Sequence, residues 1–215
     1  MLNLGVLASG RGSNFQSIID EIEAGNLKAS IRLLITDNPD AYVIDRAKRH
    51  SVEYLYLNPC DFTLKDDFYV KIAGELIKWD VDLVILAGFM RIVRKPLIDA
   101  FPNRIMNIHP SLLPSFKGLH GQKQVVDYGV RISGCTVHFV DGGMDTGPII
   151  IQAALPVSPD DTEDTLSERT LKLEHKIFPY AIRLYSEGRL SVVGRTVTIK
   201  GYEPKEDFII NPPLS

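Results

Sequence analysis

Apolar stretches alternate with amphipathic segments along the first half of this chain, and this order restricts the fold more than any other feature. The first stretch, Leu2–Ala8, is apolar throughout, which is typical of a strand buried on both faces of a sheet. Similar stretches recur at Ile31–Thr36, Val52–Leu57, Leu83–Ala87 and Ile105–His109. Segments with helical character lie between them, at Asn14–Ala24, Ala41–His50 and Thr63 to about Trp79. Alternating strands and helices favour a mostly parallel, doubly wound α/β sheet.

The second half of the chain departs from this order. Gly134–Val140 alternates between two faces, and Ile149–Pro156 follows after a short glycine-rich loop, which predicts an antiparallel hairpin that extends the sheet. A helix of roughly Thr165–Glu187 would then close the domain, and Leu190–Ile199 would form a small strand pair. We expect a single domain over residues 1–215, with a loose tail from about residue 202.

Composition excludes several classes of protein. A net charge of -3 leaves no general basic field for nucleic acid, so a small anionic ligand would be held by local groups. No apolar run is long enough to span a membrane, and the first residues lack a signal-peptide pattern. The two cysteines, Cys60 and Cys135, match no metal spacing. We therefore expect a cytoplasmic protein with reduced thiols, no bound metal and no membrane partner.

The glycine-containing segment Ala8–Asn14 links the first strand to the first helix. Glycines allow close approach to a ligand, and a helix amino terminus offers free N–H groups to a phosphate. Ser13 is a good N-cap, with Gln16 three residues on as in a capping box. The dinucleotide fingerprint fails because Phe15 stands where its third glycine is required, and no Walker lysine is present. The segment predicts a site for a monophosphate; a plain tight turn before a capped helix is the alternative.

Two polar residues share one face at the end of the strand Ile105–His109. Side chains alternate along a strand, so Asn107 and His109 lie on the same side, and Pro110 ends the strand directly afterwards. Ligands of open parallel sheets bind at such carboxyl ends. An amide and an imidazole placed together can polarise a carbonyl and stabilise the oxyanion that forms when it is attacked. The alternative is a buried polar pair satisfied by the backbone.

A loop with glycines on both sides of Asp145 follows the Gly134–Val140 strand. Asp145 could pair with His109, orienting the imidazole and favouring its charged form; the alternative is an ordinary hairpin turn. No Gly-x-Ser-x-Gly elbow is present, so the substrate would supply the nucleophile, as an amine attacking an acyl carbon does. His120, in the loop Ser111–Gly121, is either a supporting residue, a helix cap or a solvated side chain.

In order along the chain, these motifs resemble those of the phosphoribosylglycinamide formyltransferases, which are folate-dependent enzymes of purine biosynthesis. The resemblance extends to about Gly188 and rests on Ser9–Asn14, Leu86–Ile92, Asn107–Pro114, Gly118–His120 and the Asp145 loop. It implies a Rossmann-like fold of the formyltransferase type. It also implies transfer of the formyl group of 10-formyltetrahydrofolate, as co-substrate, to the amine of glycinamide ribonucleotide.

The resemblance further implies a role for particular residues. Asn107 and protonated His109 would hold the oxyanion, while Asp145 keeps His109 charged and helps to move the proton through water. The ribonucleotide would be bound by Gly12, Ser13, Asn14, Phe15 and, at the ribose, Glu174. The folate would lie between Leu86, Met90, Arg91, Ile92 and Val93 on one side and Val140, Asp141, Gly142, Gly143 and Met144 on the other. Residues of about 1–100 would form the phosphate-binding half, and those of about 101–200 the catalytic and folate-binding half.

Some residues carry competing interpretations. Met90, Ile92 and Val93 could equally be core, and Arg91 could meet a folate carboxylate or be solvated. Lys65 stands where some relatives carry an arginine that contacts the folate tail, and a lysine cannot form the same bidentate pair.

Three rival functions remain at this stage. A 10-formyltetrahydrofolate hydrolase usually has an additional amino-terminal domain, whereas this chain begins at its first strand. Transferases that act on initiator tRNA or nucleotide sugars usually have a further carboxyl-terminal domain. A non-catalytic phosphate-binding module would leave Asn107, His109 and Asp145 unexplained. The expected partners are two small-molecule substrates, for a monomer or a homodimer.

Overall fold

The strands of the first half pair side by side in parallel, as predicted. A computed structural model gives the structure of residues 1–203 and 211. The parallel strands are β1 (Leu2–Leu7), β2 (Ala29–Thr36), β3 (Tyr54–Tyr56), β4 (Leu83–Leu86) and β5 (Ile105–His109). They lie in the order β3-β2-β1-β4-β5, so the direction of winding reverses at β1. In open α/β sheets, ligands bind beyond the carboxyl ends of the strands at such a reversal.

Beyond β5 the sheet becomes antiparallel. Strands β6 (Ile132–Phe139) and β7 (Ile149–Pro156) form the predicted hairpin, with β6 running against β5. Strands β8 (Leu190–Val193) and β9 (Thr196–Ile199) form the predicted terminal pair, and β9 lies next to β7. The described residues therefore build one nine-stranded sheet, β3-β2-β1-β4-β5-β6-β7-β9-β8. The predicted fold class, a mostly parallel α/β sheet with an antiparallel extension, is confirmed.

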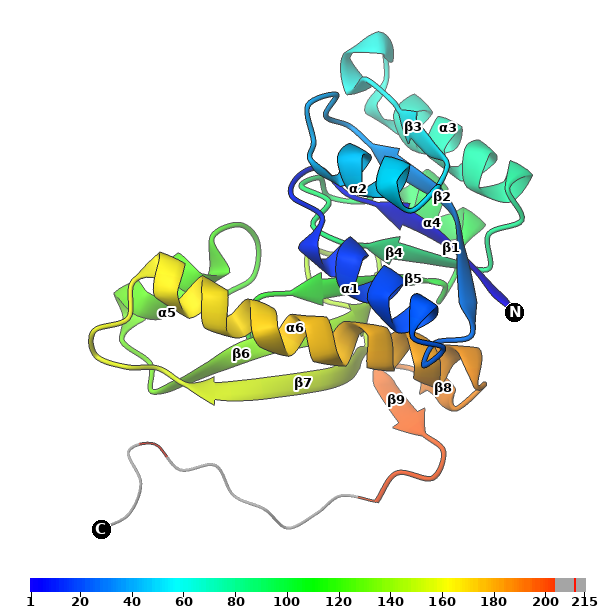
Figure 1. The fold of residues 1–215 in the computed structure, drawn as a ribbon. Helices are drawn as coiled ribbons and strands as arrows, with labels where there is room; N and C mark the ends of the chain where they lie inside the picture. The colour runs from blue at the N-terminus through cyan, green and yellow to red at the C-terminus, as the bar shows by residue number, and fades with distance from the viewer. Residues whose placement is uncertain (204–210, 212–215) are drawn as a thin grey trace.

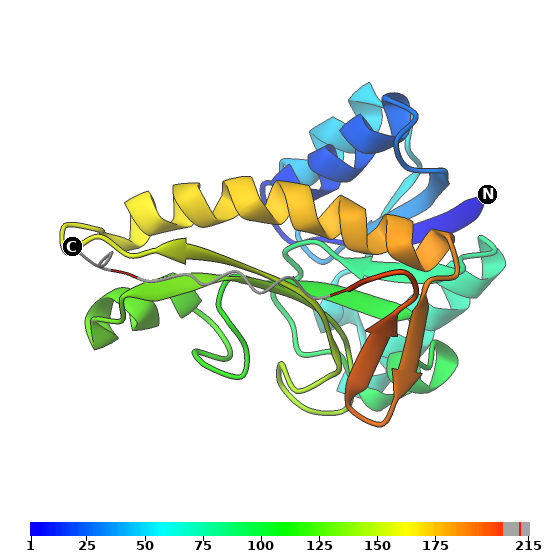
Figure 2. The ribbon, with the colours of Figure 1, turned by 90° about the horizontal axis from the view of Figure 1, so that it is seen from below.

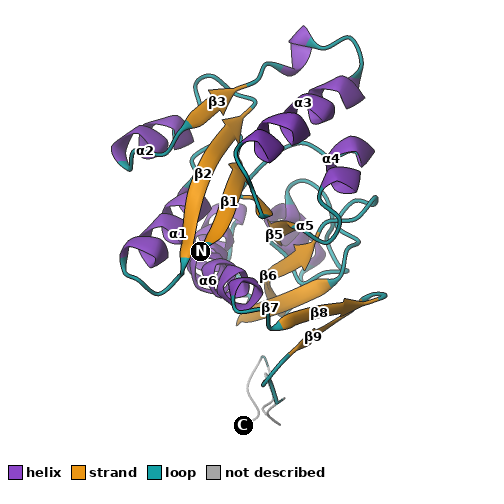
Figure 3. Cartoon of the chain, turned by 90° about the vertical axis from the view of Figure 1, so that its right-hand side faces the viewer, coloured by secondary structure: helices purple, strands orange, loops and turns teal. Residues whose placement is uncertain are grey.

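Helices cover both faces of the sheet (Figure 3). The helices are α1 (Ser13–Glu23), α2 (Val43–Arg49), α3 (Lys65–Lys78), α4 (Lys95–Ala100), α5 (Gly121–Tyr128) and α6 (Glu163–Ser186), with a 3₁₀ turn, η1, at Pro59–Asp61. One core cluster joins the sheet to α1, α2 and α6 through residues such as Phe15 and Phe178. The other joins it to α3 and α4 through Phe68 and Leu97. Within the described residues, no helix is long and apolar enough to cross a membrane.

The long helix α6 connects the two halves of the molecule. It lies along the β6–β7 hairpin and beside α1 (Figures 1 and 2). It begins at the N-cap Thr162, whose side chain accepts a hydrogen bond from the Thr165 backbone in a capping box. Its position brings residues from late in the sequence to the loop that follows β1.

Most predicted boundaries lie within two residues of those observed. The short elements α4 and α5 were not predicted. Helix α4 has only six residues, with Pro96 in its first turn, and α5 begins at Gly121. Both helices are too short to show a clear helical periodicity of apolar residues in the sequence. The predicted loose tail falls largely on residues 204–210 and 212–215, outside the described residues.

Candidate active site

A row of paired residues crosses four strands at the carboxyl edge of the sheet. Leu7 of β1 pairs with Leu86 of β4, which in turn pairs with Asn107 of β5. Asn107 then pairs with His138 of β6. Because neighbouring strands lie about 4.8 Å apart, roughly 10 Å separates the end of β1 from Asn107. The loops that follow β1 and β4 therefore open beside the predicted catalytic residues.

The loop after β1 has the geometry of an anion site. Gly12 caps α1 in the left-handed conformation, with φ of +68°, and no side chain caps this helix end. The predicted capping box of Ser13 and Gln16 is therefore wrong, since Ser13 is already the first helical residue. A left-handed glycine takes the cap position, which leaves the amide groups of the first turn for a ligand such as a phosphate.

A buried contact joins this loop to α6. The Nδ2 atom of Asn14 donates a hydrogen bond of 2.7 Å to Oε2 of Glu174, which is only 6% exposed. Burial raises the pKa of Glu174, while the hydrogen bond from Asn14 acts in the opposite direction. The Oδ1 atom of Asn14 has no hydrogen-bond partner among the described residues. Two residues that the resemblance assigns to one substrate thus lie in direct contact.

The three predicted catalytic side chains meet at the end of β5. His109 is 4% exposed, and its Nδ1 lies 3.5 Å from Oδ2 of Asp145. Asp145 extends from the β6–β7 loop, where it has a left-handed φ of +51°. Asn107 lies on the same face of β5 as His109. The imidazole and the carboxylate are therefore in contact, and the amide lies on the same side of the strand.

His138 is a fourth polar residue of this centre, and the sequence analysis did not select it. Its Nδ1 lies 2.8 Å from the Phe139 carbonyl oxygen, and its Nε2 lies 3.0 Å from Nδ2 of Asn107. Both contacts are satisfied when Nδ1 donates and Nε2 accepts. Burial lowers the pKa of His138, which favours this neutral ring. Alternation along Gly134–Val140 gives no reason to select His138, and only the strand register shows that it lies opposite Asn107.

The loop after β5 contacts both His109 and Asp145. The Nε2 atom of His109 donates to the carbonyl oxygen of Phe116 at 2.9 Å, and the amide of Gly118 donates to Oδ2 of Asp145 at 2.8 Å. Phe116 itself has a left-handed φ of +53°. A substrate oxygen that accepts a hydrogen bond from Nε2 would therefore take the place of the Phe116 carbonyl.

The residues after β4 divide into buried support and exposed surface. Leu86 and Val93 are buried against α3 and α4. Met90 and Ile92 are each 65% exposed, so the core interpretation does not apply to them. Their side chains provide exposed apolar surface in the loop that follows β4.

Polar contacts hold this loop against its neighbours. The Nε atom of Arg91 lies 2.5 Å from Oδ2 of Asp37, so its guanidinium is paired with a carboxylate of the protein. The amide of Met90 donates to the Ser9 hydroxyl at 3.0 Å, and the Ser9 amide donates to the Gly88 carbonyl at 3.0 Å. The loops after β1 and β4 are thereby linked directly.

The loop after β6 is held in shape by Asp141. Oδ1 of Asp141 accepts hydrogen bonds from the Gly143 amide and the Thr146 hydroxyl, at 3.0 and 2.6 Å. Val140 packs against the core, whereas Gly142 and Met144 are exposed.

Lys65 and His120 lie at helix starts. Lys65 is exposed as the first residue of α3, next to Asp66, which pairs with Arg94 at 2.5 Å. His120 occupies the N-cap position of α5, and its Nδ1 lies 3.5 Å from Oε1 of Glu163.

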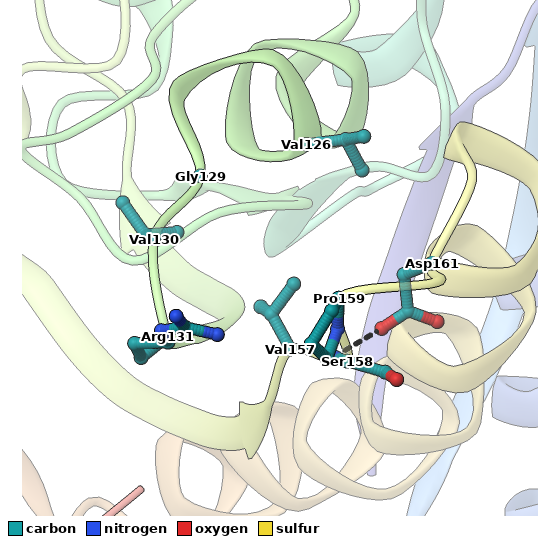
Figure 4. Close-up of a pocket in the computed structure, with 8 residues that line it drawn as sticks. All are labelled: Val126, Gly129, Val130, Arg131, Val157, Ser158, Pro159 and Asp161. Atoms are coloured by element: carbon teal, nitrogen blue, oxygen red, sulfur yellow. Dashed lines mark hydrogen bonds between the residues drawn. The ribbon is translucent and has the colours of Figure 1, made fainter. Parts of the chain in front are cut away.

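The described residues contain no cluster of three or more His, Cys, Asp or Glu side chains able to hold a metal. Cys60 and Cys135 are both free thiols. A cavity of about 170 Å³ lies near the far end of the hairpin (Figure 4). It is lined by Val126, Gly129, Val130, Arg131, Val157, Ser158, Pro159 and Asp161, none of which is a predicted site residue.

The reversal of strand order at β1 defines the class as a doubly wound α/β protein, with Asn107, His109 and Asp145 gathered at the end of β5. The family model described as formyl transferase matches residues 2–182. The chain therefore belongs to the formyl transferase family, and its similar relatives include phosphoribosylglycinamide formyltransferases.

Three relatives illustrate this similarity. The phosphoribosylglycinamide formyltransferase of Bacillus subtilis is 42% identical over 85% of this chain and 94% of its own. Glycinamide ribonucleotide transformylase 1 from Symbiobacterium toebii, whose crystal structure is known, is 49% identical in sequence. The match covers 93% of this chain and 94% of that chain, and the two structures superpose with a TM-score of 0.91. The trifunctional purine biosynthetic protein adenosine-3 of Drosophila melanogaster is 43% identical over 85% of this chain, which spans only 14% of that relative.

Proposed function

We propose that this protein transfers the formyl group of 10-formyltetrahydrofolate to the amine of glycinamide ribonucleotide, in de novo purine biosynthesis. The observation that carries the proposal is the row of residues from Leu7 to His138. Along this row the proposed phosphate site and the proposed oxyanion site would lie roughly 10 Å apart at one sheet edge. A ribosyl phosphate with an amine at its other end fits this separation. The names of the B. subtilis and S. toebii relatives support the same substrate.

The ribonucleotide would be anchored at both its phosphate and its ribose. The free amides of the first turn of α1, at Ser13, Asn14 and Phe15, would bind the phosphate oxygens beside Gly12. Glu174 would accept hydrogen bonds from the ribose hydroxyls, which is consistent with its buried position against Asn14.

The reaction exchanges one carbon–nitrogen bond for another. The amine attacks the formyl carbon, a new C–N bond forms, the bond to the folate nitrogen breaks, and one proton passes from the amine to that nitrogen. The Asn107 amide, held by His138, and the His109 imidazole would donate to the developing oxyanion. The carboxylate of Asp145 would stabilise positive charge on His109 and assist the proton transfer through water.

The folate would bind between the loops after β4 and β6. Exposed Met90 and Ile92 offer apolar contact on one side, while the backbone of residues 140–144 offers donors and acceptors on the other. Arg91 is paired with Asp37, so a folate carboxylate would have to share or displace that partner. Lys65 is exposed and can make a single ionic contact with the folate tail.

One assay tests the proposed function. The protein is mixed with 10-formyltetrahydrofolate, with and without glycinamide ribonucleotide, and tetrahydrofolate release is measured. We expect release only when the amine is present. Release without the amine would indicate the rival hydrolase, and no release under either condition would favour the non-catalytic phosphate-binding module.

A further inference from the structure

We propose that Arg46 of α2 is a positioning residue for the phosphate loop (residues 10–15). It holds the loop in the shape that a phosphate ester requires without contacting the ester. The inference rests on the proposed function, because it takes this loop to be the phosphate site of the substrate.

Arg46 contacts the chain on both sides of Gly12, at Arg11 within the loop and at Gln16 directly after it. Its Nε donates a hydrogen bond of 3.0 Å to the carbonyl oxygen of Arg11, directly before Gly12. Its Nη1 donates a hydrogen bond of 2.9 Å to Oε1 of Gln16, one turn into α1. The guanidinium is planar and rigid, so the two contacts fix the distance between these points. A flexible glycine turn is thereby held from its two ends.

Helix α2 itself is closely packed on the loop. The amide of Val43 donates to the Gly10 carbonyl at 3.1 Å. A Cβ atom on Gly12 would lie 2.5 Å from Cγ2 of Val43, so there is no space between the loop and the helix. The guanidinium of Arg46 also lies over the Tyr42 ring, 5.1 Å from its centroid. Arg46 therefore extends from a helix packed on the loop and lies against an aromatic ring.

The Gln16 side chain, which accepts the second hydrogen bond from Arg46, is itself held in place. Nε2 of Gln16 donates to Oδ1 of Asp20 at 2.8 Å and lies 3.0 Å from Nε2 of His50. His50 in turn lies 2.7 Å from a carboxylate oxygen of Glu23. These contacts orient the Gln16 amide so that its oxygen faces Arg46. The arrangement stabilises the loop before any ligand arrives, which lowers the entropy cost of binding.

Helix α2 also supplies a matched control residue. Arg49 lies 5.3 Å from the centroid of the same Tyr42 ring and donates to its hydroxyl at 2.8 Å and to the Asp45 carbonyl at 3.2 Å. Neither of these hydrogen bonds reaches the phosphate loop. Arg46→Met and Arg49→Met each remove one positive charge from the same helix. A comparison between them therefore separates the effect of the Arg46 contact with the loop from the effect of lost positive charge near the loop.

The first test compares steady-state kinetics of the two variants. Arg46→Met should raise KM for glycinamide ribonucleotide about tenfold, the effect of losing a charged hydrogen bond, while kcat and KM for the folate stay within about twofold. Arg49→Met should leave all three values within about twofold of the parent protein. Equal effects of the two variants, or a loss confined to kcat, would overturn the proposal.

The second test asks whether charge alone is enough. Arg46→Lys keeps the charge, but one ammonium cannot reproduce the rigid two-ended contact, so its KM should stay raised. Complete recovery with lysine would contradict a positioning role. Glycinamide riboside, which lacks the phosphate, should be used equally well by the parent protein and Arg46→Met. A loss on the riboside as large as on the ribonucleotide would overturn the proposal.

A third measurement requires no turnover. Titration calorimetry with inorganic phosphate should show weaker binding to Arg46→Met than to Arg49→Met, with thermal melting recorded for both. If the parent protein lacked formyl transfer but Arg46→Met still bound phosphate more weakly than Arg49→Met, the proposed function would fail. The role of Arg46 at an anion site would stand. Equal phosphate affinities in the two variants would refute the role of Arg46 itself.

Discussion

The phosphate loop and the reaction centre are built in opposite ways. The loop is one continuous stretch between β1 and α1, and a single left-handed residue, Gly12, sets its direction. The reaction centre joins Asn107 and His109 of β5 to His138 of β6 and to Asp145 of the next loop. One region depends on local backbone geometry, and the other depends on strand register.

This difference predicts that the two regions affect different kinetic constants. The donors of the loop are backbone amides, so changes around it alter how well the anion is bound rather than the chemistry at the reaction centre. A centre assembled from several strands loses its geometry when any one support is removed. We therefore expect changes in the reaction centre to lower kcat, and changes in the loop to raise KM for the ribonucleotide.

The largest effect is expected at the oxyanion donors. Asn107→Ala or His109→Ala should lower kcat by about a hundred- to a thousandfold, because each removes a donor to the developing charge. Binding of the ribonucleotide, measured by calorimetry, should remain close to that of the parent protein. Full turnover by either variant would contradict the assigned roles.

A smaller effect is expected at His138, which acts through Asn107. His138→Phe removes the acceptor that holds the Asn107 amide and should lower kcat about tenfold. The double variant with Asn107→Ala should be no slower than Asn107→Ala alone, because both changes disable the same donor. Additive losses in that double-mutant cycle would show that His138 works independently.

The loop is tested by a pair of glycine substitutions. Gly12→Ala should raise KM for the ribonucleotide about tenfold, because it strains a left-handed residue and pushes a methyl group into Val43. Gly10→Ala meets no atom within 4 Å and should have a much smaller effect. Similar values of KM for the two variants would show that the conformation of Gly12 does not set the site.

The smallest effect concerns the pH dependence of stability. Because burial raises the pKa of Glu174, the folded protein holds this proton more tightly than the unfolded chain does. The contribution of Glu174 to stability is therefore greatest at acid pH, and it falls as pH rises from the ordinary carboxyl range toward the raised pKa.

Glu174→Gln removes this loss and should raise the melting temperature at pH 8 by about 2–4 °C, with little difference at pH 4. Glu168→Gln, on the exposed face of the same helix, should change neither value. A melting temperature for Glu174→Gln that falls at pH 8 would contradict the assigned cost of ionising Glu174.

The same contrast explains what the sequence could predict. The alternation of strands and helices and the position of the phosphate loop follow from local signals, namely apolar runs, glycines and a helix start. The location of Asn107 and His109 on the same face follows from the alternation of side chains along one strand. The contact of Asn107 with His138 depends on the β5–β6 register, and that of Asn14 with Glu174 on the path of α6, neither of which has a local signal. The capping box failed because a glycine conformation overrode a good capping residue.

The most direct test of the account is a crystal structure with glycinamide ribonucleotide and a folate analogue that cannot transfer its formyl group. The account predicts the phosphate on the amides of residues 13–15 and the formyl oxygen about 2.7–3.1 Å from Nδ2 of Asn107. It also predicts the amine facing the formyl carbon beside His109. A ribonucleotide phosphate bound away from the loop, or a formyl group out of reach of Asn107, would contradict the claim that the two regions form one site.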